Sequence, residues 1–309
     1  MLNNPISKIL LMGMLAAAVL SGCSTEPESQ PDAGAQVTEP LKGGSGKLFF
    51  AARAGSKSQF DVYFLNLETG KSYQLSDNGE ADISPDFTST GNLLVFSTNR
   101  GGSYDIFRMV LPDGGVDQLT TASSDETEPR ISQDGKYVAY QSDGSGDYDI
   151  WVLNLSDGST DTLTTEDTQE TQPGWSPDGS RLVYVSNRDG DFELFSMTAD
   201  GTDVRQLTEN EVYDAAPVWS PDGGRLAFIS KRDQHFQLFL LDLQSGEERQ
   251  LTDSANTIHS PAWSPDGKFI AYVSESGKNC QLNAYELATG KSYLVTSGFS
   301  KYSGLSWED

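Results

Sequence analysis

The sequence has 309 residues, a formal net charge of −24, two cysteines and two histidines. Such an acidic excess argues against binding to nucleic acid and against direct docking on anionic lipid, since both are themselves negatively charged. Two cysteines are also too few for a disulfide framework.

Residues 1–22 have the features of an export signal. Lys8 precedes the apolar run ILLMGMLAAAVL, which is too short to be a membrane-spanning helix. Residues 20–23, LSGC, overlap the end of this run and resemble the bacterial lipobox, which implies that Cys23 becomes the acylated first residue of the mature chain. The alternative is an ordinary signal peptide with an incidental cysteine. The lipoprotein sorting rule that this resemblance brings depends on the residue after the cysteine. Ser24 at that position implies localisation to the outer membrane.

Residues 23–46 are rich in proline, glycine, serine and acids, and they show no apolar periodicity. This composition predicts a disordered acidic tether after the lipidated cysteine, because such a segment cannot bury enough apolar surface to fold. We therefore expect a lipoprotein on the periplasmic side of the outer membrane that touches the membrane through its lipid anchor only.

The remainder of the chain, residues 47–309, is repetitive. Its clearest markers are 44 residues apart: Trp175, Trp219, Trp263 and Trp307. Ile131 stands one period earlier, and we place Ile83 before it, assigning the extra length to an insertion, FTSTG, after Asp86. A period of about 40–45 residues with several short strands per unit is typical of propeller blades.

One unit shows how the blade is built. VWS is a short strand, and Pro221-Asp222-Gly223 provides a hairpin turn in which proline presets φ and glycine accepts a positive φ. The apolar run RLAFIS is typical of a buried second strand, FQLFLLDL of a third, and ERQLT of a fourth. These four antiparallel strands form one blade.

Residues 47–309 accommodate six such blades. The region starts with KLFFAAR, a second strand, and ends with SGLSWED, an inner strand. We therefore predict an all-β, six-bladed propeller of four-stranded antiparallel blades, closed by pairing of the strand near Trp307 with the strand at 47–53. The tryptophans are interpreted as packing between adjacent blades, and Cys280 as a buried thiol at the start of a third strand.

The repeated pattern, W-S-P-D-G followed by a strand and S-x-R-D-G, resembles the repeat of the TolB propeller over essentially all of residues 47–309. The resemblance implies the propeller fold and a periplasmic, protein-binding role in the cell envelope. The α/β domain that precedes the propeller in TolB has no counterpart before the first blade.

The sequence predicts no enzyme and no cofactor. Nucleophilic hydrolysis needs a base beside the nucleophile, but the histidines are limited to His235 and His259, and a G-x-S-x-G motif is absent. Propeller lyases that act on pectin fragments hold a metal with several histidines, which two cannot supply. Because a glycosidase needs only two carboxylates, the acid-rich loops leave that activity formally open.

The candidate site comes from aligning the repeats. Five residues before the anchors stand Asn78, Glu126, Glu170, Asp214, Ile258 and Tyr302. Three residues before the same anchors stand Glu80, Glu128, Gln172, Ala216, Ser260 and Gly304. In a propeller these positions surround one mouth of the central channel. The predicted partner-binding residues are Glu80, Glu126, Glu128, Glu170, Asp214, His259 and Tyr302.

Three interpretations of these acids remain open. Arg100, Arg188 and Arg232 can neutralise them locally. A basic segment of another protein can dock at the mouth. Alternatively, Ca²⁺ or Mg²⁺ can bind there, with Glu126, Glu170 and Asp214 as candidate ligands.

The predicted function is a non-catalytic, monomeric scaffold, similar in role to the Tol system. It binds an envelope protein or a peptidoglycan-associated protein at the acidic mouth, and it does not bind nucleic acid. The alternative is a propeller that binds a small ligand, a saccharide or a divalent cation, as a sensor or as an accessory to carbohydrate processing.

Overall fold

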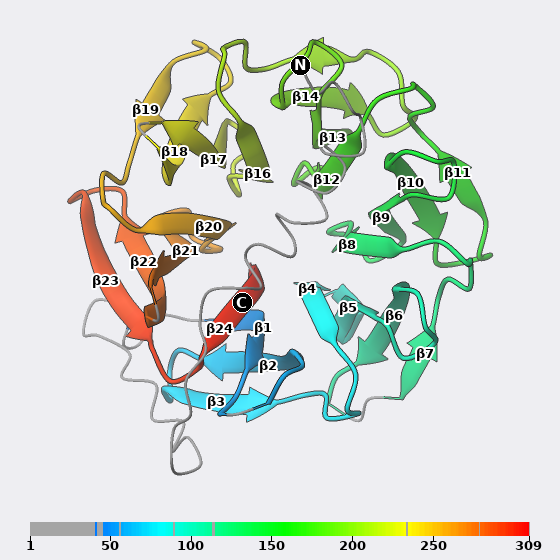
Figure 1. Cartoon of the computed structure of the whole chain (residues 1–309), viewed down its shortest axis with the longest axis horizontal. Coiled ribbons are helices and arrows are strands. Elements are labelled where there is room, and N and C mark those ends of the chain that lie inside the picture. Colours follow the sequence, from blue (N-terminus) through cyan, green and yellow to red (C-terminus); the bar gives the residue numbers. More distant parts are fainter. Residues whose placement is uncertain are drawn as a thin grey trace, which may run out of the picture.

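The computed structural model describes residues 41, 46–55, 57–88, 90–112, 115–232, 234–277 and 279–308. They form six four-stranded antiparallel sheets arranged as blades around one axis (Figure 1), which confirms the predicted fold. Within these residues, a short 3-10 helix, η1 (Thr90–Asn92), interrupts the strands, and no helix is long and apolar enough to cross a membrane. The predicted export signal, Cys23 and most of the tether lie outside the described residues.

Each blade has an inner strand nearest the axis and a second strand paired with it. The inner strands are β24 (Lys301–Glu308), β4 (Asp82–Thr88), β8 (Glu126–Ile131), β12 (Glu170–Trp175), β16 (Asp214–Trp219) and β20 (Thr257–Trp263). The second strands are β1 (Lys47–Arg53), β5 (Leu93–Thr98), β9 (Tyr137–Ser142), β13 (Arg181–Ser186), β17 (Arg225–Arg232) and β21 (Phe269–Ser276).

The third and fourth strands complete each blade towards the rim. The third strands are β2 (Asp61–Asn66), β6 (Asp105–Val110), β10 (Asp149–Asn154), β14 (Glu193–Thr198), β18 (His235–Asp242) and β22 (Asn279–Glu286). The fourth strands are β3 (Lys71–Gln74), β7 (Val116–Gln118), β11 (Thr160–Thr162), β15 (Arg205–Gln206), β19 (Glu248–Gln250) and β23 (Lys291–Thr296). Most of these outer strands are short, which limits the exposed sheet edge.

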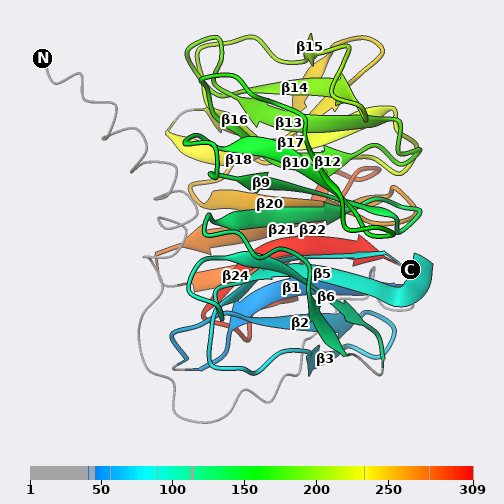
Figure 2. The same ribbon diagram turned by 90° about the vertical axis from the view of Figure 1, so that its right-hand side faces the viewer.

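The ring closes through the two ends of the propeller. Strand β24 pairs antiparallel with β1, so the first blade has the order β24-β1-β2-β3. The register runs from Lys47 opposite Glu308 to Arg53 opposite Lys301, with one bulge after Phe50. The predicted pairing of the C-terminal strand with residues 47–53 is therefore confirmed. Figure 2 shows the ring of blades from the side.

The hydrophobic core lies between neighbouring blades. Phe49 of the first blade stacks on Phe87 of the second, with ring centroids 4.3 Å apart, inside a cluster drawn from both sheets. The repeated tryptophans join blades in the same way. For three of the four, the indole Nε1 donates to a backbone carbonyl of the preceding blade, at 3.1 Å for Trp175 and Trp219 and at 3.2 Å for Trp263. Trp307 packs in the cluster between the sixth and first blades. These bonds confirm the predicted packing role.

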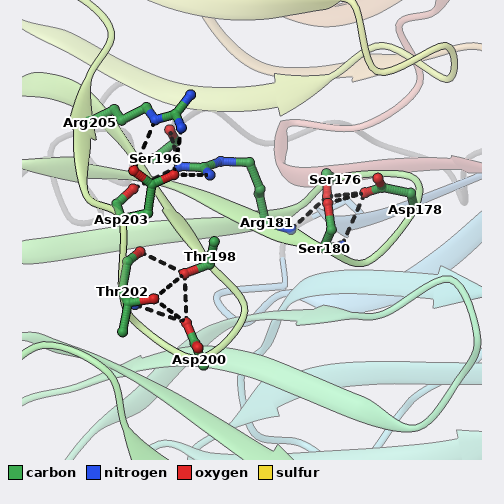
Figure 3. Close-up of polar contacts among 10 residues, drawn as sticks. All are labelled: Ser176, Asp178, Ser180, Arg181, Ser196, Thr198, Asp200, Thr202, Asp203 and Arg205. Carbon is green, nitrogen blue, oxygen red and sulfur yellow. Dashed lines mark hydrogen bonds and ion pairs between the residues drawn. The ribbon is translucent and has the colours of Figure 1, made fainter.

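Turns between inner and second strands lie on one face of the ring, which we call the turn face. In the fourth blade Asp178 Oδ1 accepts from Ser176 Oγ at 2.7 Å and from Ser180 N at 3.0 Å (Figure 3). Ser176 Oγ in turn accepts from Arg181 N at 2.9 Å. The W-S-P-D-G phrase is thus a self-bonded turn, as its chemistry predicts.

The repeat alignment was wrong in one blade. Phe87 pairs with Leu94 in the same register that joins Ile131 to Val138 and Trp175 to Leu182. The anchor of this blade is therefore Phe87, not Ile83, and there is no insertion. The phrase SPDF imitates the SPDG turn but lies within β4, where Asp86 Oδ2 accepts from Ile131 N at 2.8 Å.

Candidate functional site at the mouth face

We call the face at which the inner strands begin the mouth face. The corrected alignment places six residues at one repeat position near the start of these strands: Asp82, Glu126, Glu170, Asp214, Ile258 and Tyr302. Every one of them is at most 2% exposed. The predicted residues Glu126, Glu170 and Asp214 therefore do share one ring position, but their side chains are buried inside the blades.

Nearby hydroxyl and amide groups donate to one carboxylate oxygen of Glu126, Glu170 and Asp214. Glu170 Oε1 accepts from Thr168 Oγ1 at 2.6 Å and from Ser186 Oγ at 2.7 Å. Burial nevertheless raises the pKa of Glu170, and also that of Asp214. Asp214 accepts from the amide of Asn210 at 3.0 Å. Such bonds make the carboxyl groups part of the blade junctions.

Arginines neutralise only some of the ring. Arg100 contacts Asp82 at 3.3 Å, and Arg188 contacts Glu170 at 3.7 Å. Arg232 pairs with Glu248 instead of Asp214. Local pairing therefore accounts for two of the three predicted arginines.

A second set of acids starts the third strands at the same face. Asp61, Asp105, Asp149 and Glu193 recur at one repeat position, and all are at most 3% exposed. Burial, together with the charge of Glu126, raises the pKa of Asp105 to about 6. Burial likewise raises the pKa of Glu193 to about 7, with Asp214 as a further cause. Acids of neighbouring blades thus face each other across these junctions.

This pairing is the feature that sequence analysis missed. Asp61, Asp105 and Asp149 are 44 residues apart in the sequence, but the acid that faces each of them in the next blade is not evident from that spacing alone. The Asn210 amide shows the arrangement most clearly, because its Nδ2 reaches Asp214 at 3.0 Å and Glu193 at 3.4 Å. The signal was the spacing of 21 residues between each such acid and the acid that begins the following inner strand.

Residues with positive φ follow two positions later on each inner strand. They are Ser84, Glu128, Gln172, Ala216, Ser260 and Gly304. Some of them bond directly to a neighbouring blade: Ser84 Oγ donates to Glu128 Oε1 at 2.8 Å, and Ala216 N donates to Gln172 Oε1 at 2.8 Å. A Cβ at Gly304 would lie 2.7 Å from the Cα of Ser84, so this last position requires glycine.

The other predicted residues are dispersed. Glu80 does not share the position of Glu128, which Ser84 occupies; it is exposed on the loop before β4. Glu128 pairs with Arg130 at 3.4 Å. His259 Nε2 lies 3.5 Å from Glu275 Oε1, and its Nδ1 lies 3.0 Å from Ser260 Oγ. Tyr302 is fully buried against Phe50 and Phe299.

No metal cluster emerges from this arrangement. Within the described residues, no three histidine, cysteine, aspartate or glutamate side chains lie close enough together to hold a metal ion. The candidate ligands Glu126, Glu170 and Asp214 start different inner strands and bond to their own blades. Cys280 is 4% exposed, as predicted, and its Sγ donates to Glu275 Oε1 at 3.5 Å.

Comparison with solved structures finds the same fold in proteins of diverse kinds. TolB from Acinetobacter baumannii superposes with a TM-score of 0.75 at 18% identity, and the match covers 85% of this chain but 66% of that one. A protein assigned as TolB from Agrobacterium tumefaciens gives 0.67 at 22% identity, covering 83% and 92%. An oligogalacturonate lyase in complex with manganese gives 0.56 at 15%, covering 82% and 74%. Identities this low show the fold alone.

Comparison of the sequence itself identifies a family. No curated protein matches the chain. The profile of the TolB beta propeller domain matches residues 42–172 and 129–307, which together span most of the sequence. The chain therefore belongs to the TolB beta propeller domain family.

Proposed function

We propose that this protein is a non-catalytic, lipid-anchored scaffold of the cell envelope that faces the periplasm and binds a cationic surface of another protein at its mouth face. Family membership supports a protein-binding role. The distribution of charge selects the face through exposed loop acids, of which only Glu80 was among the residues predicted from the repeat alignment.

The mouth-face loops carry many exposed carboxylates. They are Asp77, Glu80, Glu166, Asp167, Asp189, Glu209, Glu211 and Asp253. Among the described basic residues at this face, Lys57 and Lys231 are exposed; Lys57 pairs with Asp61 and Asp77, and Lys231 lies over the ring of Phe236. Of the acids, Glu166 pairs with Arg188 at 3.2 Å. Such an imbalance produces a negative potential that attracts and orients a cationic partner. This imbalance is the observation that carries the proposal.

The proposal uses exposed acids for binding and assigns the buried ring to stability. Reversing charge at Glu126, Glu170 and Asp214 would test folding more than binding, because these side chains are buried. A sharper test reverses two exposed mouth-face acids, Glu209→Lys with Glu211→Lys. The matched control reverses two exposed turn-face acids, Glu68→Lys with Glu247→Lys.

The experiment is a crosslinking pull-down from intact envelopes with the full lipoprotein and both double variants. We expect a defined protein to be recovered with the wild type and the turn-face variant, and to be depleted with the mouth-face variant. Equal recovery by all three forms would contradict a mouth-face site, and enrichment of no protein by any form would contradict a scaffold.

The anchor is tested separately. Cys23→Ala removes the residue that the lipobox places at the acylation site, so the protein should leave the outer-membrane fraction and lose incorporated palmitate. Unchanged fractionation and labelling would overturn the anchor without bearing on the binding face.

A further inference from the structure

Three blades hold an arginine over an aromatic ring at the mouth face. The guanidinium carbon lies 4.5 Å from the ring centroid for Arg100 over Phe107, 4.8 Å for Arg188 over Phe195, and 4.3 Å for Arg232 over Phe239. Each arginine stands at one repeat position just after the second strand or at its end, and each phenylalanine is the third residue of the repeat's third strand motif. The guanidinium is attracted to the face of the ring, and it shields that face from water.

The third blade breaks this pattern at both positions. Gly144 stands where these three blades have arginine, and Trp151 stands where they have phenylalanine. The first and sixth blades also lack the pair, with Tyr63 and Asn283 at the aromatic position. The three phenylalanines are at most 6% exposed, whereas Trp151 is only partly buried. The blade has thus lost its own cation and gained a larger aromatic face.

The missing guanidinium also leaves an acid without a basic partner. In the second and fourth blades the arginine contacts the inner acid, Asp82 or Glu170. In the third blade the inner acid is Glu126, for which no ion pair forms within the described residues. Asp214 of the fifth blade also has no ion pair there, because Arg232 pairs with Glu248. The site therefore lacks a positive charge that its sister blades possess.

A pocket of about 520 Å³ opens beside this position, between the loop after β9 and the loop after β11. Its lining includes Gly144, Asp147, Asp149, Trp151, Glu166 and Asp167. Asp149 is held in place by Ser145 and by Thr164 Oγ1 at 3.0 Å. Glu166 and Asp167 are exposed at the rim, where Glu166 also contacts Arg188 at 3.2 Å. The pocket combines an aromatic wall with four carboxylates.

We propose that this pocket receives an arginine side chain of a bound protein, whose guanidinium lies against Trp151 in the place that the sister blades fill themselves. The planar guanidinium can stack on the indole and donate to rim carboxylates at once, which an ammonium group cannot do. The inference rests on the proposed binding of a protein at the mouth face, and it names the group that the partner supplies.

The first test measures the pocket without the partner. Full-length protein labelled with ¹⁵N-tryptophan is titrated with Nα-acetylarginine amide, and the indole signal of Trp151 is assigned with Trp151→Phe. We expect that signal to shift with a dissociation constant in the millimolar range, while the neutral analogue Nα-acetylcitrulline amide leaves it unchanged. Absence of a shift with the arginine compound, or an equal shift with Nα-acetyllysine amide, would overturn the guanidinium assignment.

Variants locate the binding. Gly144→Arg restores the arginine of the sister blades and should weaken binding about tenfold or more by filling the pocket. Its Cβ would lie 3.2 Å from Ser124 Oγ, so a second variant that adds no bulk, Glu166→Gln with Asp167→Asn, is used beside it and should weaken binding severalfold. Thr121→Arg is the matched control, because Thr121 is the repeat equivalent of the pocket residue Thr165 and adds the same charge outside the pocket. Unchanged affinity in the Glu166/Asp167 variant, or equal loss in the control, would contradict the site.

The second test repeats the envelope pull-down with Gly144→Arg and Thr121→Arg. Depletion of the partner by Gly144→Arg alone supports arginine insertion. Recovery of the same partner by both variants overturns it while leaving the scaffold function intact. Conversely, if the arginine amide binds but no protein is enriched by the wild type, the pocket's specificity for guanidinium stands and its occupation by a protein partner is refuted together with the scaffold function.

Discussion

The two faces of the ring use the same residue types in opposite ways. On the turn face, hydrogen bonds from Ser176 and Ser180 hold the pKa of Asp178 low, and those from Thr198 and Thr202 lower that of Asp200 to about 2 (Figure 3). On the mouth face, burial raises the pKa of Asp105 to about 6 and of Glu193 to about 7. Position in the blade therefore decides what an acid does.

The contrast teaches how a repeat divides stability from binding. Turn-face acids are committed to their own turns or to neighbouring basic residues, as with Arg181 and Arg205 on Asp203. Mouth-face acids are either buried at the blade junctions or exposed on loops with few basic neighbours. The exposed group is the one that remains available to a partner.

The largest expected effect comes from reversing a buried mouth-face acid. Glu170→Lys places a cation at a fully buried site beside Arg188, so it should lower the free energy of unfolding by roughly 3–5 kcal/mol. The exposed turn-face change Glu68→Lys should stay within about 0.5 kcal/mol. Urea unfolding of both variants checks this, and similar midpoints would erase the distinction between the faces.

Stability should depend on pH with opposite signs at the two faces. The pKa values of Asp105 and Glu193 in the folded state lie above the values of about 4 in the unfolded chain. At pH values between the unfolded and folded pKa values, the folded state therefore binds more protons than the unfolded state. Their contribution is complete below about pH 4 and is lost as pH rises through 6 to 7, on the order of 2 kcal/mol.

Two comparisons test that pH dependence. Glu193→Gln should flatten the decline in the free energy of unfolding between about pH 5 and 8. Urea unfolding at pH values about one unit apart measures this decline. The low pKa of Asp200 acts in reverse, since its contribution is present above about pH 4 and is lost as pH falls towards about 2. A stability that rises from pH 5 to 8 would contradict the assignment of the mouth-face pairs.

A smaller effect is expected from a single turn. Asp178→Ala removes the acceptor for Ser176 and Ser180, which should cost about 1 kcal/mol. Because the turn is local, the mouth-face pH dependence should remain. Thermal unfolding at two pH values measures both quantities, and loss of the pH dependence would show that the faces are coupled.

The smallest effect should come from an exposed turn-face ion pair. Lys268 contacts Asp266 at 2.8 Å, but both side chains are at least half exposed. Lys268→Ala should change the unfolding free energy by less than about 0.5 kcal/mol. A larger loss in chemical denaturation would mean that turn-face charges contribute more than their solvent exposure implies.

The sequence was sufficient for the fold because its period is strict. The tryptophan spacing predicted six blades, and the two partial units at the ends predicted the pairing of β24 with β1. The one error arose where Phe87 replaces tryptophan and SPDF imitates a turn, which moved the anchor to Ile83 and brought Glu80 into the ring. Equivalent residues of different blades are defined by the pairing register of their strands, and not by the letters of the sequence motif.

The candidate site was only partly predictable. The ring position of Glu126, Glu170 and Asp214 followed from the repeat, but their burial depends on how adjacent blades pack, which one sequence does not specify. Gly144 and Trp151 were visible as departures from arginine and phenylalanine at aligned positions. Their importance became clear only beside the geometry of the three sister blades.

The most direct test of the central claim compares the two faces in intact envelopes. A photo-reactive amino acid is placed either at Thr165 on the mouth face or at Thr69 on the turn face, both exposed threonines. The account predicts a defined crosslinked protein from position 165 and none from position 69. A product from position 69 alone would contradict it.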